Sequence, residues 1–178
     1  MHSPRVLGLA GWSGAGKTTL LTRLIPLLVA RGLRVTTIKH AHHEFDVDTP
    51  GKDSYEHRRA GASEVIVASS RRWVQMHELN GEEEPKLAWL LGRVTACDLV
   101  LVEGYKRERH PKLEIYRSVV GKPPLYPDDP RIVAVATDGT LPGQHPPAIN
   151  LNDIPAVAEA VLAHALPLRK VLSLLETG

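Results

Sequence analysis

Eight residues near the start of the chain have the types and the spacing needed to hold a chain of phosphates. Residues 11–18 read Gly-Trp-Ser-Gly-Ala-Gly-Lys-Thr and fit the pattern G-x-x-x-x-G-K-[ST]. The glycines let backbone N–H groups turn inward around phosphate oxygens. Lys17 would reach the β and γ phosphates, and the Thr18 hydroxyl would ligate Mg²⁺. The residues expected to line this nucleotide phosphate site are Gly11, Ser13, Gly14, Ala15, Gly16, Lys17, Thr18 and Thr19.

The flanking residues place this loop between a strand and a helix. The apolar run 6–10 precedes the loop, and residues 16–31 follow it with apolar side chains at a helical period, ending before Gly32. A helix N-terminus points free N–H groups and partial positive charge at a bound anion. The alternative is a glycine-rich turn with a chance lysine, which would require neither the strand before the loop nor the helix after it. Pro26 lies inside the predicted helix, where we expect a kink.

Two acids flank the apolar run 99–102 and compete for the role of metal carboxylate. Asp98 and Glu103 are five residues apart, roughly 16 Å along a strand, so they lie at its opposite ends. Ligands bind at the carboxyl ends of parallel strands, which favours Glu103 as the catalytic and Mg²⁺-binding residue beside Lys17. Asp98 is then a solvated residue at the strand start. An exposed acid without a role is the alternative for Glu103.

The polar loop 39–52 follows a predicted strand and therefore begins at the same edge of the sheet. Asp46, Asp48 and Asp53 lie in or just after this loop, and comparable loops of nucleotidases bring a carboxylate to Mg²⁺. Asp53 has an equally good alternative role as a helix cap, because Asp53 and Glu56 have the spacing of a capping box. Solvation of the loop is the alternative for the other two acids.

Three histidines of the same loop, His40, His42 and His43, raise the alternative of a transition-metal site, because imidazole suits Zn and Ni. A P-loop metallochaperone GTPase would combine such a site with the phosphate loop. However, His42 and His43 are adjacent, and the only cysteine, Cys97, is far away in sequence. A contact of His40 with a phosphate or a substrate is the favoured interpretation.

Basic residues follow two of the strands expected at the ligand edge. The loop 105–112 leaves the Glu103 strand, and Arg58 and Arg59 follow the 39–52 loop. These charges suit an anionic ligand or an acidic partner, and a solvated face is the alternative for each of them. The candidate contacts are His40, Arg58, Lys106, Arg109 and Lys112.

Asp138 ends another predicted strand, residues 132–136, in the sequence Ala136-Thr137-Asp138. GTPases often read guanine with an aspartate at this point, preceded by a lysine two residues earlier. Ala136 stands where that lysine would be, so Asp138 is only a weak candidate for guanine binding.

The whole chain fits one folded domain, because it has 178 residues of which 43% are hydrophobic. Strands that alternate with helices predict a three-layer α/β fold of the P-loop NTPase type, with a mostly parallel sheet. Segments 65–77 and 113–116 are expected to add antiparallel edge strands. We assign residues 1–165 to a P-loop nucleotide-binding domain and residues 166–178 to a C-terminal tail without a role.

Charge and cysteine content narrow the functional classes further. A formal net charge of +2 is too small to indicate nucleic-acid binding. The sequence has no apolar run of roughly 18 residues that would predict a membrane span. With one cysteine no internal disulfide is possible, and no signal-peptide pattern precedes the first strand. We therefore expect a cytoplasmic protein.

Several segments form a pattern that is much more specific than the phosphate loop alone. They are residues 11–18, 38–43 with Asp46 and Asp48, 51–54 with Arg58 and 60–62, 98–106 with 111–112, and 136–138. Together they resemble MobB, the molybdopterin-guanine dinucleotide biosynthesis protein B family. The resemblance spans roughly residues 5–165 of the chain.

The resemblance implies a GTP-binding P-loop protein of the dethiobiotin-synthetase-like class, with weak GTPase activity at most. It implies a homodimer that assists a separate, MobA-type guanylyltransferase, which attaches GMP to molybdopterin. It also implies that Glu103 is the Mg²⁺ carboxylate and that Asp53 is a second one. The expected cofactors are therefore GTP and Mg²⁺, and molybdopterin is a candidate ligand. A small-molecule kinase and a metallochaperone remain as alternatives, and the sequence leaves open both the choice between GTP and ATP and the purpose of hydrolysis.

Overall fold

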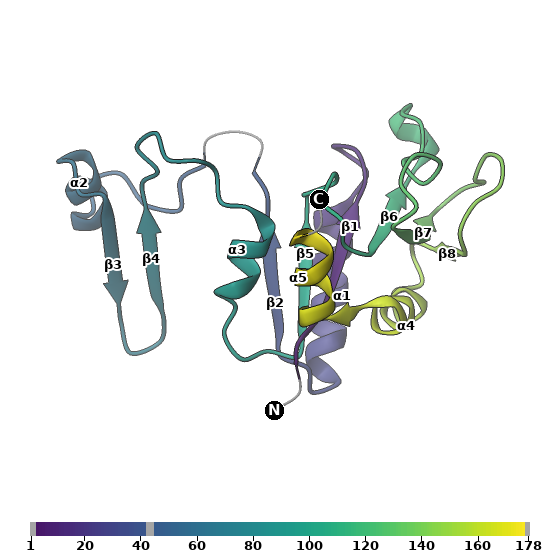
Figure 1. The fold of residues 1–178 in the computed structure, drawn as a ribbon, viewed down its shortest axis with the longest axis horizontal. Helices are drawn as coiled ribbons and strands as arrows, with labels where there is room; N and C mark the ends of the chain where they lie inside the picture. Colours follow the sequence, from purple (N-terminus) through teal and green to yellow (C-terminus); the bar gives the residue numbers. More distant parts are fainter. Residues whose placement is uncertain (1–2, 42–44, 177–178) are drawn as a thin grey trace. The chain divides into compact units, whose positions relative to one another are not determined.

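The computed structural model describes residues 3–41 and 45–176 (Figure 1). The chain forms two compact units: Met1–His40 with Leu87–Gly178, and Ala41–Lys86. His42 and His43, two of the histidines considered for a metal site, lie outside the described residues. Within the described ranges, no helix is both long and apolar enough to cross a bilayer.

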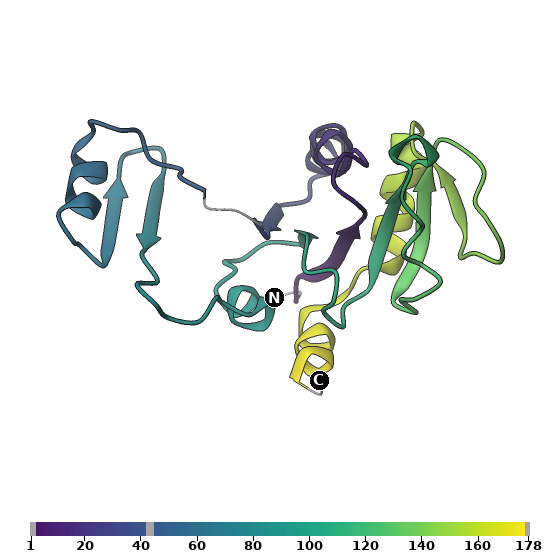
Figure 2. The same ribbon diagram turned by 90° about the horizontal axis from the view of Figure 1, so that it is seen from above.

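A mostly parallel sheet forms the centre of the first unit (Figure 2). Its strand order is β2-β5-β1-β6-β7-β8, and all neighbours along this path are parallel. The strands are β1 (Arg5–Ala10), β2 (Val35–Lys39), β5 (Leu99–Glu103), β6 (Lys112–Tyr116), β7 (Ile132–Thr137) and β8 (Ala148–Asn150). Because parallel strands end at the same edge, the residues that follow β1, β2, β5, β6 and β7 gather at one side of the unit.

Helices cover both faces of this sheet. On one face, α1 (Lys17–Ala30) and α4 (Ile154–His164) pack their aliphatic side chains against Leu7 and Leu9 of β1. On the other face, α3 (Leu87–Gly92) and α5 (Leu168–Glu176) pack against Val6 and Val100. Figure 2 shows α1 on the side of the sheet opposite α3 and α5. The result is a helix–sheet–helix arrangement with an aliphatic core.

The last part of the chain belongs to this core. The short strand β9 (Leu166–Pro167) pairs antiparallel with β1, and the Leu168 N–H donates to the Pro4 carbonyl. Val171 of α5 is fully buried in the cluster that α3 also joins. Residues 166–176, for which the sequence suggested no role, therefore complete one face of the sheet.

The second unit contains α2 (Asp53–Arg59) and a separate antiparallel sheet of β3 (Glu64–Ala68) and β4 (Trp73–His77). Asp53 is the first residue of α2, and Lys52 stands at its N-cap without a side-chain hydrogen bond. The capping role considered for Asp53 is therefore not present.

The predicted α/β class with a mostly parallel sheet is confirmed, and two details differ. The antiparallel pair of residues 65–77 forms its own sheet instead of an edge of the main one. Residues 112–116 are not an antiparallel edge strand either, because β6 runs parallel between β1 and β7. Lys112 and Glu114 of this segment are polar, yet both are buried.

Candidate functional site

The glycine loop joins β1 to α1, and its backbone requires the glycines that the motif supplies. Gly11, Gly14 and Gly16 have φ angles of 146°, 80° and 93°, in the region that L residues rarely adopt. A Cβ on Gly11 would lie 2.6 Å from the Ile115 carbonyl oxygen, so only glycine passes β6 at this point. The loop therefore has the conformational freedom that inward-turned N–H groups need.

Lys17, the first residue of α1, folds its side chain back over this loop. Its ammonium donates hydrogen bonds to the carbonyl oxygens of Gly11 (2.9 Å) and Trp12 (3.0 Å). Both bonds join the lysine to its own loop, and neither neutralises its charge. The side chain is thus held where the sequence places the β and γ phosphates.

The charges around Lys17 set its pKa and the local potential. Partial burial lowers the pKa of Lys17 below its ordinary value, and the nearby Glu103 carboxylate opposes this shift. The ammonium groups of Lys106 and Lys39 lower the Lys17 pKa further. The cations Lys17, Lys39 and Lys106 around the Glu103 carboxylate favour the binding of a polyphosphate at this edge.

Thr18 and Glu103, two of the three predicted Mg²⁺ ligands, come from different elements and meet beside Lys17. The Thr18 hydroxyl of α1 donates to Glu103 Oε1 at 3.4 Å, and Glu103 is the last residue of β5 with 9% of its surface exposed. Mg²⁺ takes hydroxyl and carboxylate oxygens and usually fills its remaining positions with phosphate oxygens and water. The residues present therefore fit a Mg²⁺–nucleotide complex.

Asp98, the competing acid, lies at the other end of β5. Its carboxylate accepts hydrogen bonds from the Arg34 guanidinium (Oδ2–Nε 3.1 Å, Oδ1–Nη2 3.1 Å) and from the Arg34 backbone N–H (2.8 Å). The prediction that the two acids occupy opposite ends of the strand is confirmed. Asp98 joins the starts of β2 and β5 as part of an ion pair.

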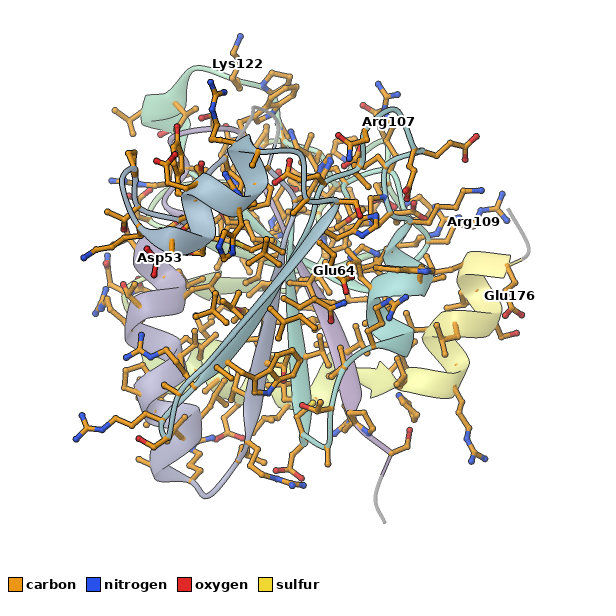
Figure 3. All side chains as sticks on the ribbon, turned by 90° about the vertical axis from the view of Figure 1, so that its left-hand side faces the viewer. Asp53, Glu64, Arg107, Arg109, Lys122 and Glu176 are labelled. Carbon is orange, nitrogen blue, oxygen red and sulfur yellow. The ribbon has the colours of Figure 1, made fainter. Side chains whose placement is uncertain are left out.

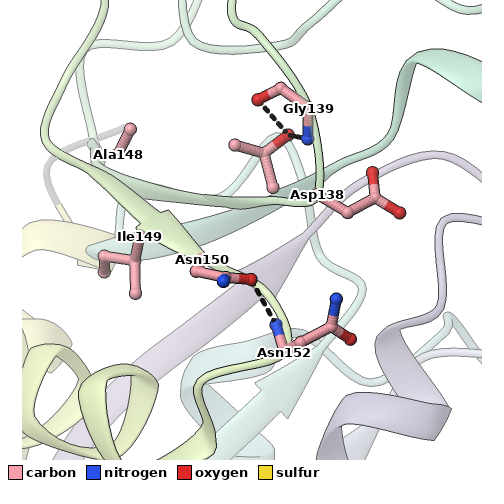
Figure 4. A pocket seen from close by; sticks show the side chains of 7 residues that line it. Asp138, Gly139, Ala148, Ile149, Asn150 and Asn152 are labelled. Atoms are coloured by element: carbon pink, nitrogen blue, oxygen red, sulfur yellow. Dashed lines mark hydrogen bonds between the residues drawn. The ribbon is translucent and has the colours of Figure 1, made fainter.

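Two neighbouring hollows extend from the phosphate loop toward β8. The smaller one, of about 170 Å³, is lined by Ala15, Gly16, Thr19, Leu20, Arg23, Arg117, Asp138, Leu151 and Asn152. The larger and more open one, of about 510 Å³ (Figure 4), is lined by Thr137, Asp138, Gly139, Ala148, Ile149, Asn150 and Asn152. Asp138 and Asn152 line both, so a path leads from the phosphate loop to the end of β7.

Asp138 follows β7 and stands where the two hollows meet. Its Oδ2 atom accepts a hydrogen bond of 2.7 Å from Nε of Arg117, which follows β6. The structure thus brings the weak guanine candidate into the same path as the phosphate loop. Sequence reasoning missed Arg117 and Asn152. Arg117 directly follows the strand 113–116, and this position could have pointed to the ligand edge of the sheet. Sequence reasoning did not use it because it expected this strand to be antiparallel and at the edge of the sheet.

His40 and Lys106 lie close to Glu103 and the phosphate loop. The His40 ring stacks on Tyr105 with centroids 4.7 Å apart, and the His40 N–H donates to the Glu103 carbonyl. The Lys106 ammonium lies 4.8 Å from the centre of the Trp12 ring. Both are therefore placed to meet a ligand at this edge. Arg109 of the same loop is exposed and extends away from the ribbon (Figure 3).

Lys112 is not available for an anionic ligand, contrary to the sequence prediction. Only 1% of its surface is exposed, because it pairs with Gly8 inside the sheet. Its ammonium donates to Asp129 Oδ2 (2.9 Å) and to the Glu108 carbonyl (2.6 Å). Lys112 therefore fixes the loops on either side of β6 and cannot contact a solute.

Arg58 is also engaged, within the second unit. Its guanidinium forms two hydrogen bonds with Asp46 (3.0 and 2.8 Å) and lies 3.8 Å from Asp48 and 3.5 Å from Glu78. The bond from Arg58 lowers the pKa of Asp46. These charges stabilise the loop before α2, and a contact between Arg58 and a ligand stays a prediction. Asp53 is exposed on α2, and its approach to a metal stays a prediction.

His110 is a further buried polar group that the sequence did not single out. It is fully buried, and its Nε2 atom lies 2.2 Å from where a Cβ on Gly8 would stand. Burial lowers its pKa from 6.5 to about 3, with the Lys112 charge as a second cause. The folded protein therefore holds His110 neutral throughout the physiological pH range.

This shift predicts a pH dependence of stability. Below pH 6.5 the unfolded chain binds a proton at His110 that the folded chain takes up only near pH 3. The free energy of unfolding should therefore fall, relative to a His110→Phe variant, by up to about 1.4 kcal/mol for each pH unit below 6.5. Urea unfolding of both proteins between pH 7.5 and 4.5 measures this difference. Parallel curves would contradict it.

Comparisons with known proteins show which family this chain belongs to. Residues 6–138 match the family described as MobB, molybdopterin guanine dinucleotide synthesis protein B. The molybdopterin-guanine dinucleotide biosynthesis adapter protein of Escherichia coli K12 is 46% identical over 160 residues, covering 88% of this chain and 91% of that protein. The adapter protein of Haemophilus influenzae is 44% identical over 162 residues, covering 88% and 86%.

The fold agrees as well. A crystal structure of molybdopterin-guanine biosynthesis protein B (mobB) matches with a TM-score of 0.70 and 29% identity, covering 92% of this chain and 99% of that one. The family match includes the phosphate loop, Glu103 and Asp138. This chain belongs to the MobB family.

Proposed function

We propose that this protein is a Mg²⁺-dependent GTP-binding adapter in the guanylation of molybdopterin, with weak GTPase activity at most. The observation that carries the proposal is the meeting of Thr18 and Glu103 beside Lys17, at a glycine loop from which hollows lead to Asp138. The names of the E. coli and H. influenzae relatives support the adapter role.

At the phosphate end, the residues bind and orient a triphosphate. Backbone N–H groups of the loop would receive the phosphate oxygens, and the Lys17 ammonium would exchange its two loop carbonyls for β and γ oxygens. Thr18 and Glu103 would hold Mg²⁺. When bound, the metal neutralises charge on the β and γ phosphates.

At the base end, the larger hollow takes the purine and ribose. Guanine presents two neighbouring N–H donors, and an ionised carboxylate accepts both. Asp138 lines this hollow, two strands away from the phosphate loop in the sheet order. Adenine presents an acceptor where guanine presents a donor, so the carboxylate favours GTP over ATP.

The site supports an accessory role rather than the guanylyl transfer itself. Lys17, Thr18 and Glu103 gather at the β and γ phosphates, whereas a guanylyltransferase must align its acceptor with the α phosphate. A MobA-type guanylyltransferase is therefore the expected partner, and a homodimer is the expected assembly. Lys106 and Arg109, on the loop after β5, are candidate contacts for the phosphate of molybdopterin.

Calorimetric titration of GTP and ATP, with and without Mg²⁺, tests the nucleotide site. We expect tighter binding of GTP than of ATP, and binding that strengthens with Mg²⁺. Purified protein given GTP, Mg²⁺ and molybdopterin should form no guanylated product, because Lys17, Thr18 and Glu103 gather where the β and γ phosphates are expected and not at the α phosphate. Product formed by this chain alone would contradict the adapter role.

Two further outcomes would replace this proposal with its alternatives. Rapid transfer of the γ phosphate to a small acceptor would identify a kinase. Tight binding of Ni²⁺ or Zn²⁺ without nucleotide would identify a metallochaperone.

A further inference from the structure

Arg117 and Asp138 form an ion pair at the ligand edge because their strands are parallel neighbours. Tyr116 of β6 pairs in register with Thr137 of β7, so the residues that follow them stand side by side. Arg117 Nε donates to Asp138 Oδ2 at 2.7 Å, and the two side chains are 38% and 28% exposed. Both therefore remain accessible to a ligand while they hold each other.

The pair also lies where the two parts of the nucleotide path meet. Arg117 and Asp138 line the smaller hollow together with Gly16 and Thr19 of the phosphate loop region. Asp138 alone of the two also lines the larger hollow, which Figure 4 shows from close by. The Asp138 carboxylate, held by Arg117, would thus face the base, while Arg117 itself stays in the smaller hollow beside the phosphate loop.

We propose that Arg117 is a positioning residue that sets the base selectivity of this site by fixing the Asp138 carboxylate toward the purine. The inference rests on the proposed nucleotide site. It also explains how the site works without the lysine that GTPases place two residues before this aspartate. Ala136 is fully buried at that position, and the cation comes instead from the neighbouring strand.

The chemistry of the pair supports this role. Arg117 donates a charge-assisted hydrogen bond to Asp138, and an ionised carboxylate can only accept hydrogen bonds. Each carboxylate oxygen accepts more than one bond, so the bond from Nε leaves capacity for the guanine N1–H and 2-amino groups. Without Arg117 the Asp138 side chain can adopt more rotamers, and it must lose this freedom again when the nucleotide binds. This cost weakens the contact with the base and leaves the phosphate contacts unchanged.

The experiment compares GTP with ITP, which lacks the 2-amino group, in titrations with Mg²⁺. Arg117→Ala should lower GTP affinity about tenfold and ITP affinity less, so the preference for GTP over ITP shrinks several-fold. Arg117→Lys, which keeps the charge without the fixed geometry of the guanidinium, should show an intermediate preference. Arg34→Ala is the matched control. It removes the Arg34–Asp98 pair at the starts of β2 and β5, away from the carboxyl ends of the strands, and should leave both affinities unchanged.

The outcomes separate this inference from the proposed function. Equal loss of GTP and ITP affinity in Arg117→Ala would overturn it and make Arg117 a phosphate or ribose contact. Unchanged selectivity would also overturn it, while leaving the nucleotide site intact. Failure of the unmodified protein to bind any nucleotide would instead refute the proposed function. Melting temperatures of the variants confirm that each is folded, and Arg117→Gln replaces Arg117→Ala if that variant is not.

Discussion

Replacement of Lys17 by alanine should weaken GTP binding about 100-fold, equivalent to roughly 2.7 kcal/mol, and leave the nucleotide-free protein almost as stable as before. The reason lies in what the ammonium contacts. It bonds to the carbonyl oxygens of Gly11 and Trp12 in its own loop, and among the residues that the structure describes it forms no ion pair within hydrogen-bonding distance. These carbonyls can bond to water instead, whereas phosphate oxygens lose a charge-assisted donor.

Calorimetry measures the affinity, and thermal unfolding without nucleotide measures the stability. Lys170→Ala is the matched control, because Lys170 is exposed on α5 and the substitution removes the same charge far from the loop in sequence. Unchanged GTP binding by Lys17→Ala would remove the basis for a phosphate site at this loop.

The second large effect is expected for Glu103→Gln. This change keeps the shape of the side chain and removes the charge that Mg²⁺ requires, beside the Thr18 hydroxyl at 3.4 Å. We expect the apparent Mg²⁺ affinity in the presence of GTP to fall about 100-fold, at the upper end of the effects seen for groups around a metal. Titration of GTP at increasing Mg²⁺ concentration measures this loss.

Asp98→Asn provides the control within the same strand. It weakens an exposed ion pair with Arg34 at the opposite end of β5, which contributes at most about 1 kcal/mol to stability. Mg²⁺-dependent binding should not change. A damaging Asp98→Asn together with a silent Glu103→Gln would show that the metal lies elsewhere.

The sequence predicts the phosphate loop and Glu103 well because local patterns determine both. The motif fixes the order of residues around Lys17, and the apolar run before Glu103 identifies a buried parallel strand whose carboxyl end faces ligands. These two local patterns were enough to predict that Thr18 and Glu103 lie close together, as they do in the structure.

The position of β6 could not be predicted in the same way. Its sequence alternates between polar and apolar residues, a pattern of strands with one solvated face. In the structure Lys112 is neutralised by Asp129, and Glu114 accepts the N–H groups of Leu125 and Tyr126. These partners come from a later loop, so the sequence pattern near β6 does not reveal them.

Ion pairs between residues that are distant in sequence account for what sequence reasoning did not find. It named no partner for Arg58, whereas the structure places Asp46 beside it. Arg117 received no role because its partner, Asp138, follows a strand that becomes a neighbour only in the folded sheet. Pairings of this kind depend on topology, which local sequence does not encode.

The most direct test of the adapter role is the rate of guanylated product formation by the separate guanylyltransferase, measured at limiting GTP with molybdopterin and Mg²⁺. We predict that the unmodified protein raises this rate above that of the transferase alone, and that Lys17→Ala fails to do so while Lys170→Ala succeeds. An equal rate with and without the unmodified protein would contradict the account. Full enhancement by Lys17→Ala would contradict it as well, because the phosphate loop would then have no part in the function.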